Sequence, residues 1–238
     1  MSAPGPLVPA LSKLPNFDPR TAAVTGIDTH LPPVRPQALT PAALRARFAA
    51  PPAWQPEITV ERPWTAQALA HASVLVPIVR RDRPTVILTE RTTHLSTHSG
   101  QVAFPGGKRD ETDTDATHTA LREAHEEIGL EQRFVEVIGQ MPTYTTGSQF
   151  IITPVIALVD PAHALTLNAY EVADAFEVPL DFLMNPAHHH RHALEWDGHR
   201  REWLSMPYMD GSTERFIWGA TAAMLRNLYR LLATSEAT

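Results

Sequence analysis

The distribution of proline is the feature that most constrains how this chain can fold. Of its 22 prolines, 13 lie in residues 1–63. Proline fixes φ and removes a backbone N–H, so a segment this rich in proline forms little helix or sheet. We therefore divide the chain into a Pro-rich N-terminal extension, residues 1–65, and a folded domain, residues 66–238.

The extension contains one predicted helix, over residues 41–50. Thr40 is suited to the N-cap, and Pro41 would occupy the first helical position, where proline is favoured. Elsewhere we expect extended or irregular chain wrapped on the domain. Deletion of residues 1–35 should then leave a soluble, active domain.

The rest of the chain alternates β-branched runs with helical patterns, which predicts an α+β domain of three layers. Asp82 and Arg83 separate the runs 72–81 and 84–91, which indicates a hairpin. The predicted strands are 72–81, 84–91, 134–144 and 149–160, the predicted helices are 115–129 and 218–232, residues 92–114 are a predicted loop, and 169–184 should hold a helix start and a short strand.

Charge and composition exclude several classes of protein. The 20 basic and 26 acidic residues give a net charge of −6, which argues against binding to nucleic acid or to an anionic membrane. The chain has no cysteine, so disulfides, thiol nucleophiles and cysteine zinc sites are excluded. No apolar run approaches the roughly 20 residues of a membrane span, and the start of the chain does not resemble a secretory signal. We expect a cytoplasmic protein.

One predicted helix carries three carboxylates. At about 100° per residue, Glu123, Glu126 and Glu127 share the face opposite Ala124 and Ile128. Like charges four residues apart repel each other, and a divalent cation would remove that cost. Hard oxygen ligands suit Mg²⁺ or Mn²⁺ better than zinc.

Glutamates on such a face usually form a solvated surface, but the surroundings favour a site. A Gly-Gly pair, ending at Gly107, precedes the helix, and Gly129 ends it directly after the acids. Glycine lets backbone approach a phosphate or offer a carbonyl to a metal. Arg122 and Glu126 are spaced to form an ion pair.

These residues resemble the Nudix box, in which a glycine and a glutamate are followed by Arg-Glu-apolar-x-Glu-Glu-x-Gly-apolar. The segment from Arg122 to Leu130 matches without a gap, with a small Ala124 at the first apolar position. The spacing from Gly107 to Arg122 is one residue longer than in the general pattern, and Asp113 replaces the first glutamate.

The upstream sequence resembles the coenzyme A pyrophosphatase branch of the Nudix hydrolase superfamily, which shares both departures. The branch pattern is Leu-Thr-x-Arg, His-x-Gly and Phe-Pro-Gly-Gly, followed near the C-terminus by Phe-Ile-Trp-Gly-x-Thr-Ala. The matching residues are Leu88, Thr89, Arg91, His98, Gly100, Phe104, Pro105, Gly106, Gly107 and residues 216–222. The resemblance covers about residues 72–230 and leaves out the N-terminal extension.

The resemblance implies a Nudix fold, a mixed β-sheet sandwiched between α-helices. It also implies Mg²⁺- or Mn²⁺-dependent cleavage of a diphosphate linked to another moiety. Glu123 and Glu127 would bind the metal, Glu126 would bind it directly or through water, and the Gly107 carbonyl is a further candidate ligand. Arg122 would orient the acids.

Nudix enzymes often take the general base from outside the box, and Glu171, at a predicted loop-to-helix position, is the first candidate. A surface or helix-start acid is the alternative interpretation of Glu171, and Glu177 is the second candidate base. Arg91 and Lys108 could hold substrate phosphates or form ordinary surface ion pairs. His98 would have a structural or substrate-contact role.

Three functions remain open on the sequence alone. The first is cleavage of CoA or acyl-CoA to 3′,5′-ADP and 4′-phosphopantetheine or its acyl form. The second is cleavage of another nucleotide, such as ADP-ribose or a dinucleotide, and the third is a catalytically silent nucleotide-binding domain. The intact acids argue against the third.

A homodimer is one alternative for the assembly state. Residues 188–192, which contain four histidines, are expected to form a solvated loop.

Overall fold

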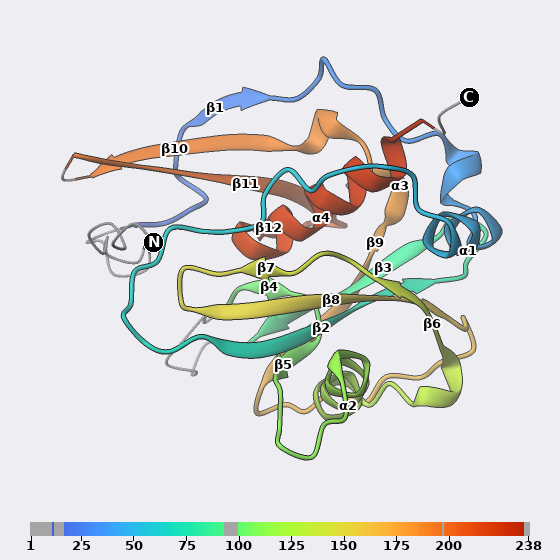
Figure 1. Ribbon diagram of the computed structural model, residues 1–238. Helices are drawn as coiled ribbons and strands as arrows, with labels where there is room; N and C mark the ends of the chain where they lie inside the picture. The colour runs from blue at the N-terminus through green and yellow to red at the C-terminus, as the bar shows by residue number, and fades with distance from the viewer. Residues whose placement is uncertain (1–10, 12–16, 93–99, 197, 236–238) are drawn as a thin grey trace.

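The computed structural model describes all residues except 1–10, 12–16, 93–99, 197 and 236–238. Two β-sheets lie above one another with helix α4 (Gly219–Ala233) between them, and helix α2 (Ala116–Ile128) covers the outer face of the larger sheet (Figure 1). The larger sheet is therefore sandwiched between two helices. This confirms the predicted α+β class and the helix–sheet–helix layering.

The larger sheet has eight strands in the order β4-β3-β2-β8-β6, with β5 paired to β2, β7 to β8 and β9 to β3. Strands β2 and β8 are parallel and the other pairs are antiparallel, so the sheet is mixed. The strands are β2 (Ala70–Val79), β3 (Thr85–Arg91), β4 (Val102–Ala103), β5 (Gly106–Lys108), β6 (Val135–Gln140), β7 (Tyr144–Thr145), β8 (Phe150–Val159) and β9 (Val172–Pro179).

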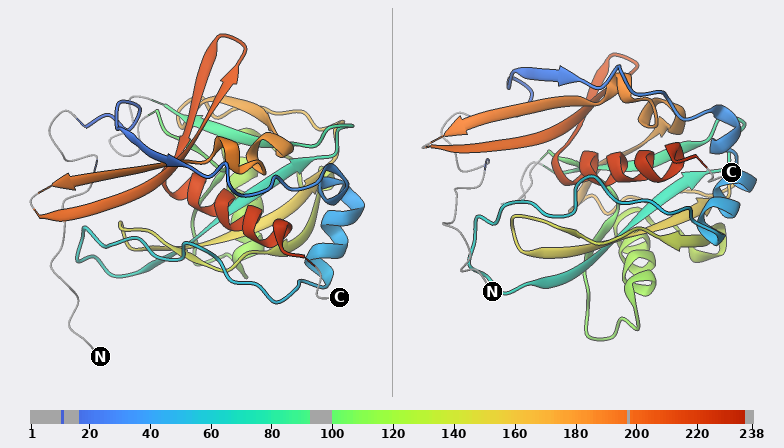
Figure 2. Two further views of the ribbon diagram at one scale, coloured as in Figure 1. Left: turned by 90° about the horizontal axis from the view of Figure 1, so that it is seen from above. Right: turned by 45° about the horizontal axis from the view of Figure 1, so that its top comes forward.

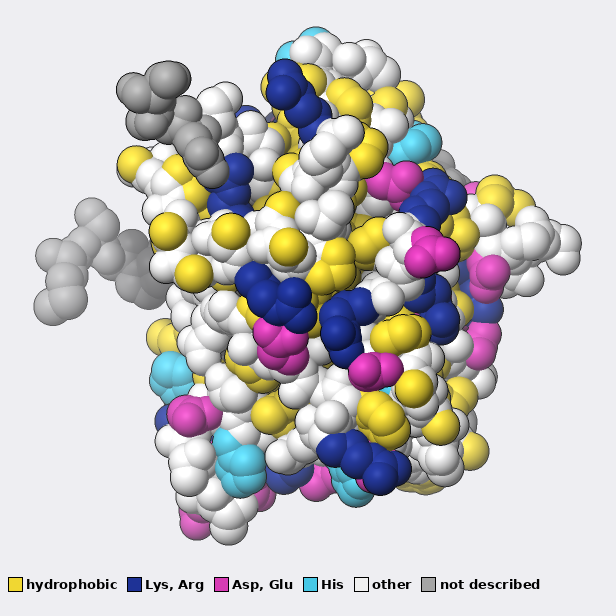
Figure 3. Space-filling model, turned by 90° about the vertical axis from the view of Figure 1, so that its right-hand side faces the viewer, with side chains coloured by type: hydrophobic (Ala, Val, Ile, Leu, Met, Phe, Trp, Pro, Cys, Tyr) yellow, Lys and Arg dark blue, Asp and Glu magenta, His cyan; other side chains and the backbone are white. Residues whose placement is uncertain are grey.

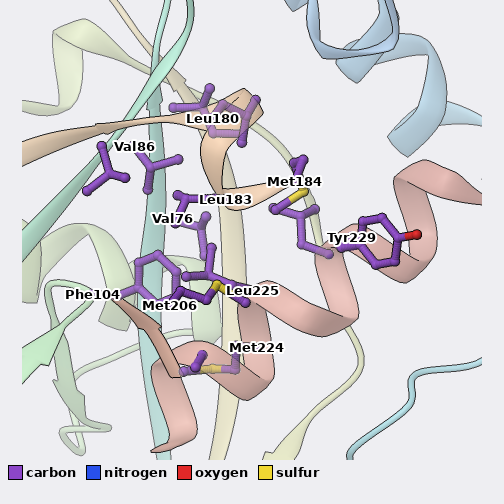
Figure 4. Packing of buried hydrophobic residues seen from close by; sticks show 14 of the residues in the cluster. Val76, Val86, Phe104, Leu180, Leu183, Met184, Met206, Met224, Leu225 and Tyr229 are labelled. Carbon is purple, nitrogen blue, oxygen red and sulfur yellow. The ribbon is translucent and has the colours of Figure 1, made fainter. Parts of the chain in front are cut away.

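Both faces of this sheet are buried, which explains the continuous apolar runs in its strands. In β2, Leu75 and Val79 pack in the cluster that contains the apolar residues of α2, whereas Val76 and Ile78 pack in the cluster that contains α4. Figure 4 shows the second cluster from close by, with Val76 near Leu225 of α4.

The smaller sheet was not predicted. It has the antiparallel order β1-β10-β11-β12, formed by β1 (Val24–Ile27), β10 (His190–Trp196), β11 (His199–Asp210) and β12 (Thr213–Trp218). The expectation that residues 188–192 form a solvated loop is wrong. His189 and His192 are buried, because the ring of His189 packs under α4 and His192 faces Trp203 on β11.

Local signals fix the ends of the predicted helices. The side chain of Thr40 accepts a hydrogen bond from the N–H of Ala43, which confirms it as the N-cap of α1 (Pro41–Ala49). In α2 the cap is Asp115, and Gly129 ends the helix at φ 65°, a left-handed conformation that glycine adopts without strain.

Two expectations about local structure are wrong. The predicted loop 92–114 contains the short strands β4 and β5. The predicted helix start in 169–184 is strand β9, because its residues pair with β3, and the short helix α3 (Leu180–Leu183) follows the strand. Three 3₁₀ helices complete the described structure: η2 (Pro36–Leu39), η3 (Gln132–Phe134) and η4 (Pro186–His188).

The N-terminal segment is packed against the domain along most of its described length. Figure 2 shows it running beside the smaller sheet and reaching α1 near the end of α4. Val34, Leu39 and Leu44 are buried in the same cluster as α4. The domain boundary at residue 65 remains a prediction, but the packed residues belong to the common core.

Ion pairs tie this segment to α4. The carboxylate of Asp28 lies 3.1 Å from Arg226 and 2.8 Å from Arg191. Glu57 lies 2.7 Å from Arg226, whose side chain is only 2% exposed. The Arg226 guanidinium also lies 3.0 Å from Nδ1 of His189. A buried arginine therefore depends on two acids that the N-terminal segment supplies.

The surface is charged but mixed in sign. On the side of the molecule where β2 ends and β3 begins, basic and acidic side chains are interspersed (Figure 3). Arg81–Glu177 and Arg83–Asp181 are ion pairs of these strand ends. Within the described residues, none of the helices has the length and apolar character needed to cross a membrane.

Candidate active site

Arg122 is the centre of the acidic site on α2. Its guanidinium donates two hydrogen bonds to Asp113, at 3.0 and 2.9 Å, and lies 2.9 Å from Glu123 and 3.0 Å from Glu126. It also donates to the carbonyl of Lys108 at 3.2 Å. Arg122 thus contacts two box carboxylates and the preceding loop at once, and one of these contacts is the pair with Glu126 that the spacing predicted.

Asp113, in the loop before α2, anchors Arg122. Its side chain is fully buried and also accepts from the N–H of Asp110 at 2.8 Å. The Arg122 guanidinium holds the pKa of Asp113 far below its usual range. A permanently ionised carboxylate therefore anchors Arg122, and Asp113 has a positioning role that sequence reasoning did not assign.

Glu127 lies in a buried place rather than on a solvated face. It is 4% exposed, because α2 packs against β2 and β5. Its Oε2 accepts from the N–H of Gly106 at 3.1 Å, and its Oε1 lies 3.7 Å from Arg91. The pKa of Glu127 is raised to about 7, chiefly by burial and also by the charges of Glu123 and Glu171, whereas the hydrogen bond from Gly106 and the charge of Arg91 act in the opposite direction.

Glu123 is in close contact with the glycine loop. A Cβ on Gly107 would lie 2.5 Å from the Glu123 carboxyl group, so only glycine fits here without moving that side chain. Burial raises the pKa of Glu123, and the charges of Glu126 and Glu171 act in the same direction against Arg122. The loop backbone and the carboxylate are therefore neighbours.

Gly106 is also restricted by space. A Cβ there would lie 2.4 Å from the backbone oxygen of Ser73 on β2. Its N–H contact with Glu127 was not predicted, although the paired glycines of the sequence mark the place where backbone approaches the acids.

Glu171 lies in the turn before β9, not at the start of a helix as predicted. Its backbone carbonyl accepts from the N–H of Thr92 at the end of β3, at 3.0 Å. Its backbone is thereby held beside the end of the strand that carries Arg91, and its negative charge raises the pKa of both Glu123 and Glu127. The second candidate base, Glu177, is already bound by both nitrogen donors of Arg81 and is part of a surface ion pair.

Lys108 makes fewer contacts with the site than the acids do. Lys108 is exposed at the end of β5, and its contact with the site is through its backbone carbonyl. His98 lies outside the described residues.

Carboxylate oxygens, which Glu123 and Glu127 supply, are the donors that a hard divalent cation prefers. Glu123 and Glu127, one helical turn apart, are carboxylates whose pKa values are raised by burial and by the charges of neighbouring carboxylates, which is the situation a cation relieves. Among the described residues, however, no three acidic or histidine side chains are already gathered at one point. Arg122 holds Glu123 and Glu126, while Glu127 faces Gly106.

Comparison with known proteins identifies the family. The NUDIX domain model matches residues 69–197. The uncharacterized Nudix hydrolase NudL of Yersinia enterocolitica is 42% identical over 159 residues, 66% of this chain and 79% of that protein. NudL of Enterobacter sp. is 40% identical over 158 residues, 66% of this chain and 80% of that protein. The chain therefore belongs to the Nudix hydrolase family.

The chain is also similar to two solved structures over about half of its length. RenU of M. smegmatis has 25% identity and a TM-score of 0.43, covering 54% of this chain and 80% of that one. A C. elegans Ap4A hydrolase in a binary complex has 16% identity and a TM-score of 0.41, covering 50% and 86%.

Proposed function

We propose that this Nudix hydrolase cleaves the diphosphate of CoA or acyl-CoA. Water attacks one phosphorus atom and the bridging P–O bond breaks, so that CoA and water yield 3′,5′-ADP and 4′-phosphopantetheine. The support is the branch pattern from Leu88 to Gly107, nearly all of which precedes the box common to the family.

The contact between Arg91 and Glu127 is the observation that carries the proposal. Arg91 belongs to the branch pattern and Glu127 to the box, and the two charged groups lie 3.7 Å apart. The side chain of Arg91 is 27% exposed, so its guanidinium is a cation beside the acidic site that a substrate phosphate can reach.

We assign the following roles to the residues of the site. Glu123 and Glu127 would hold Mg²⁺ or Mn²⁺, with Glu126 and the Gly107 carbonyl as further ligands, and the metal would neutralise the diphosphate oxygens and assist attack by water. Arg122, anchored by Asp113, keeps two acids in position. Glu171, whose charge raises the pKa of both Glu123 and Glu127, is not held by an arginine in the described contacts, and we assign it to take the proton of the attacking water.

A substrate comparison tests the proposal. We expect kcat/KM at one Mg²⁺ concentration to be at least about tenfold higher for CoA than for dephospho-CoA or ADP-ribose, because a charge-assisted contact to the additional phosphate contributes roughly that factor. If ADP-ribose equals or exceeds CoA, the enzyme acts on another nucleotide. Tight binding without turnover under Mg²⁺ or Mn²⁺ would instead indicate a silent binding domain.

We also propose a cytoplasmic location and a small-molecule nucleotide substrate rather than a nucleic acid. The absence of cysteine supports the location, because it fits a reducing compartment. The net charge of −6 argues against nucleic acid, and an anionic small molecule would be attracted by local cations.

A further inference from the structure

A pocket lies where the N-terminal segment meets the edge of the larger sheet and β12. It has a volume of about 210 Å³ and is formed by the N-terminal segment, the residues that lead into β4, and the end of β12. Its walls include Phe17, Arg20, Gly100, Gln101, Phe216 and Trp218. Aromatic rings and one guanidinium from distant parts of the chain thus meet in one concavity.

The pocket walls are held in place by ring contacts. The ring of Phe17 lies edge-on to Trp203, with centroids 5.7 Å apart, and 6.3 Å from Trp218. The guanidinium carbon of Arg20 lies 5.9 Å from the centre of the Phe216 ring, and Arg20 is exposed. These contacts preform an aromatic wall with a cation at its side.

The backbone of one residue connects this pocket to the acidic site. The N–H of Arg91 donates to the carbonyl of Gln101 at 3.0 Å, and the N–H of Gly100 donates to the carbonyl of Arg91 at 3.1 Å. The side chain of the same Arg91 reaches Glu127. The pocket wall is therefore separated from the acids by one strand spacing, about 4.8 Å, and the length of an arginine side chain.

We propose that this pocket binds the adenosine 3′-phosphate end of the substrate, with the base on the aromatic rings and the 3′-phosphate at Arg20. Aromatic faces stack on nucleobases, and arginine forms charge-assisted hydrogen bonds with phosphate. In CoA the nucleoside is joined directly to the diphosphate, so its base must lie within a nucleotide's length of the acids. The inference rests on the proposed function, because only a CoA-like substrate carries the 3′-phosphate.

Ligand binding to the full chain tests this assignment independently of turnover. We would measure binding of 3′,5′-ADP and of 5′-AMP by calorimetry for the wild type, Arg20→Ala and Phe17→Leu. The wild type should bind 3′,5′-ADP at least about tenfold more tightly than 5′-AMP, and Arg20→Ala should remove this difference. Phe17→Leu keeps an apolar side chain against Trp203 but loses the flat ring, so it should weaken both ligands. Arg35→Ala, at another exposed arginine of the same segment, is the matched control.

The outcomes separate this inference from the proposed function. If CoA is cleaved but Arg20→Ala binds 3′,5′-ADP like the wild type, the pocket assignment is wrong and the proposed function stands. Failure of the wild type to bind 3′,5′-ADP also overturns the assignment. If binding depends on Arg20 and CoA is not cleaved, the pocket is supported and the proposed function fails.

Discussion

Glu127 combines deep burial with a carboxylate whose nearest cation is 3.7 Å away. We expect Glu127→Gln to stay folded, because glutamine has the same size and its side-chain oxygen can still accept from Gly106. Turnover should fall at least about a hundredfold at saturating Mg²⁺, since a charge and a proposed metal ligand are lost together. The measurement is kcat on the best diphosphate substrate, together with thermal unfolding.

Glu131→Gln is the control for this substitution, because Glu131 is 51% exposed and pairs with Arg133 at the surface. Near-normal turnover of a folded Glu127→Gln enzyme would remove Glu127 from the metal site.

Gly107 tests the contact between the loop and the acids. In Gly107→Ala the new methyl group would lie 2.5 Å from the carboxyl group of Glu123, which is the movable end of a flexible side chain. The side chain can turn away, so we expect a small change in melting temperature and a loss of activity of about tenfold or more. Gly26→Ala is the control, since a Cβ there meets nothing within 4 Å. A Gly107→Ala enzyme with full activity would contradict the proposed placement of Glu123.

At the scale of elements, the sequence predicts best what is encoded locally. Helix α2 was predicted closely because its apolar face and Gly129 lie within one short segment, although its N-cap is Asp115, which the prediction placed inside the helix. The smaller sheet was not, because β1 pairs with a strand more than 160 residues away, at Val24↔His192, and β10 carries histidines in place of an apolar pattern. The burial of Glu127 was missed for the same reason, since β2 and β5, which pack against α2, create it.

His189, which directly follows η4 and contacts α4, is a buried neutral histidine that should make the free energy of unfolding depend on pH. Nε2 of His189 donates to the carbonyl of Leu183 and Nδ1 accepts from Arg226, so the ring is neutral in this arrangement. Burial lowers the pKa of His189 to about 4, below its ordinary value of 6.5. The unfolded chain therefore binds the proton more readily between these two pH values, and stability falls as the pH decreases from 6.5 to 4, by about 3 kcal/mol in total.

His189→Gln can keep both hydrogen bonds without titrating. We expect the free energy of unfolding of this variant to fall less than that of the wild type between pH 6.5 and 4.5, in denaturant titrations at each pH. His125→Gln, at an exposed position of α2, should follow the wild type. Parallel pH curves for wild type and His189→Gln would show that His189 titrates normally.

At the scale of the whole molecule, the N-terminal segment is structural. The sequence suggested that residues 1–35 could be removed, but this deletion takes away Val34 and Asp28 and leaves the buried Arg226 with one acid fewer. Breaking a buried ion pair typically costs about 3–5 kcal/mol. We now expect the deleted chain to melt at a much lower temperature or to aggregate.

Asp28→Asn isolates the electrostatic part of this effect and should lower the free energy of unfolding by about 3 kcal/mol. Asp18→Asn, at an exposed position of the same segment, should leave it unchanged. If the chain without residues 1–35 melts like the full protein, the ion pairs with Arg226 contribute little.

The pairing of Glu57 with Arg226 also determines when the N-terminal segment can dock on α4 during synthesis. The two residues are 169 positions apart, and a ribosome adds about 5–20 residues per second, so Glu57 waits roughly 10–30 s for its partner. Over that interval the apolar residues of η2 and α1 have no α4 to cover them. The segment that carries Glu57 thus leaves the ribosome well before it can dock, and nascent chains that stop before α4 should expose it to proteases and chaperones.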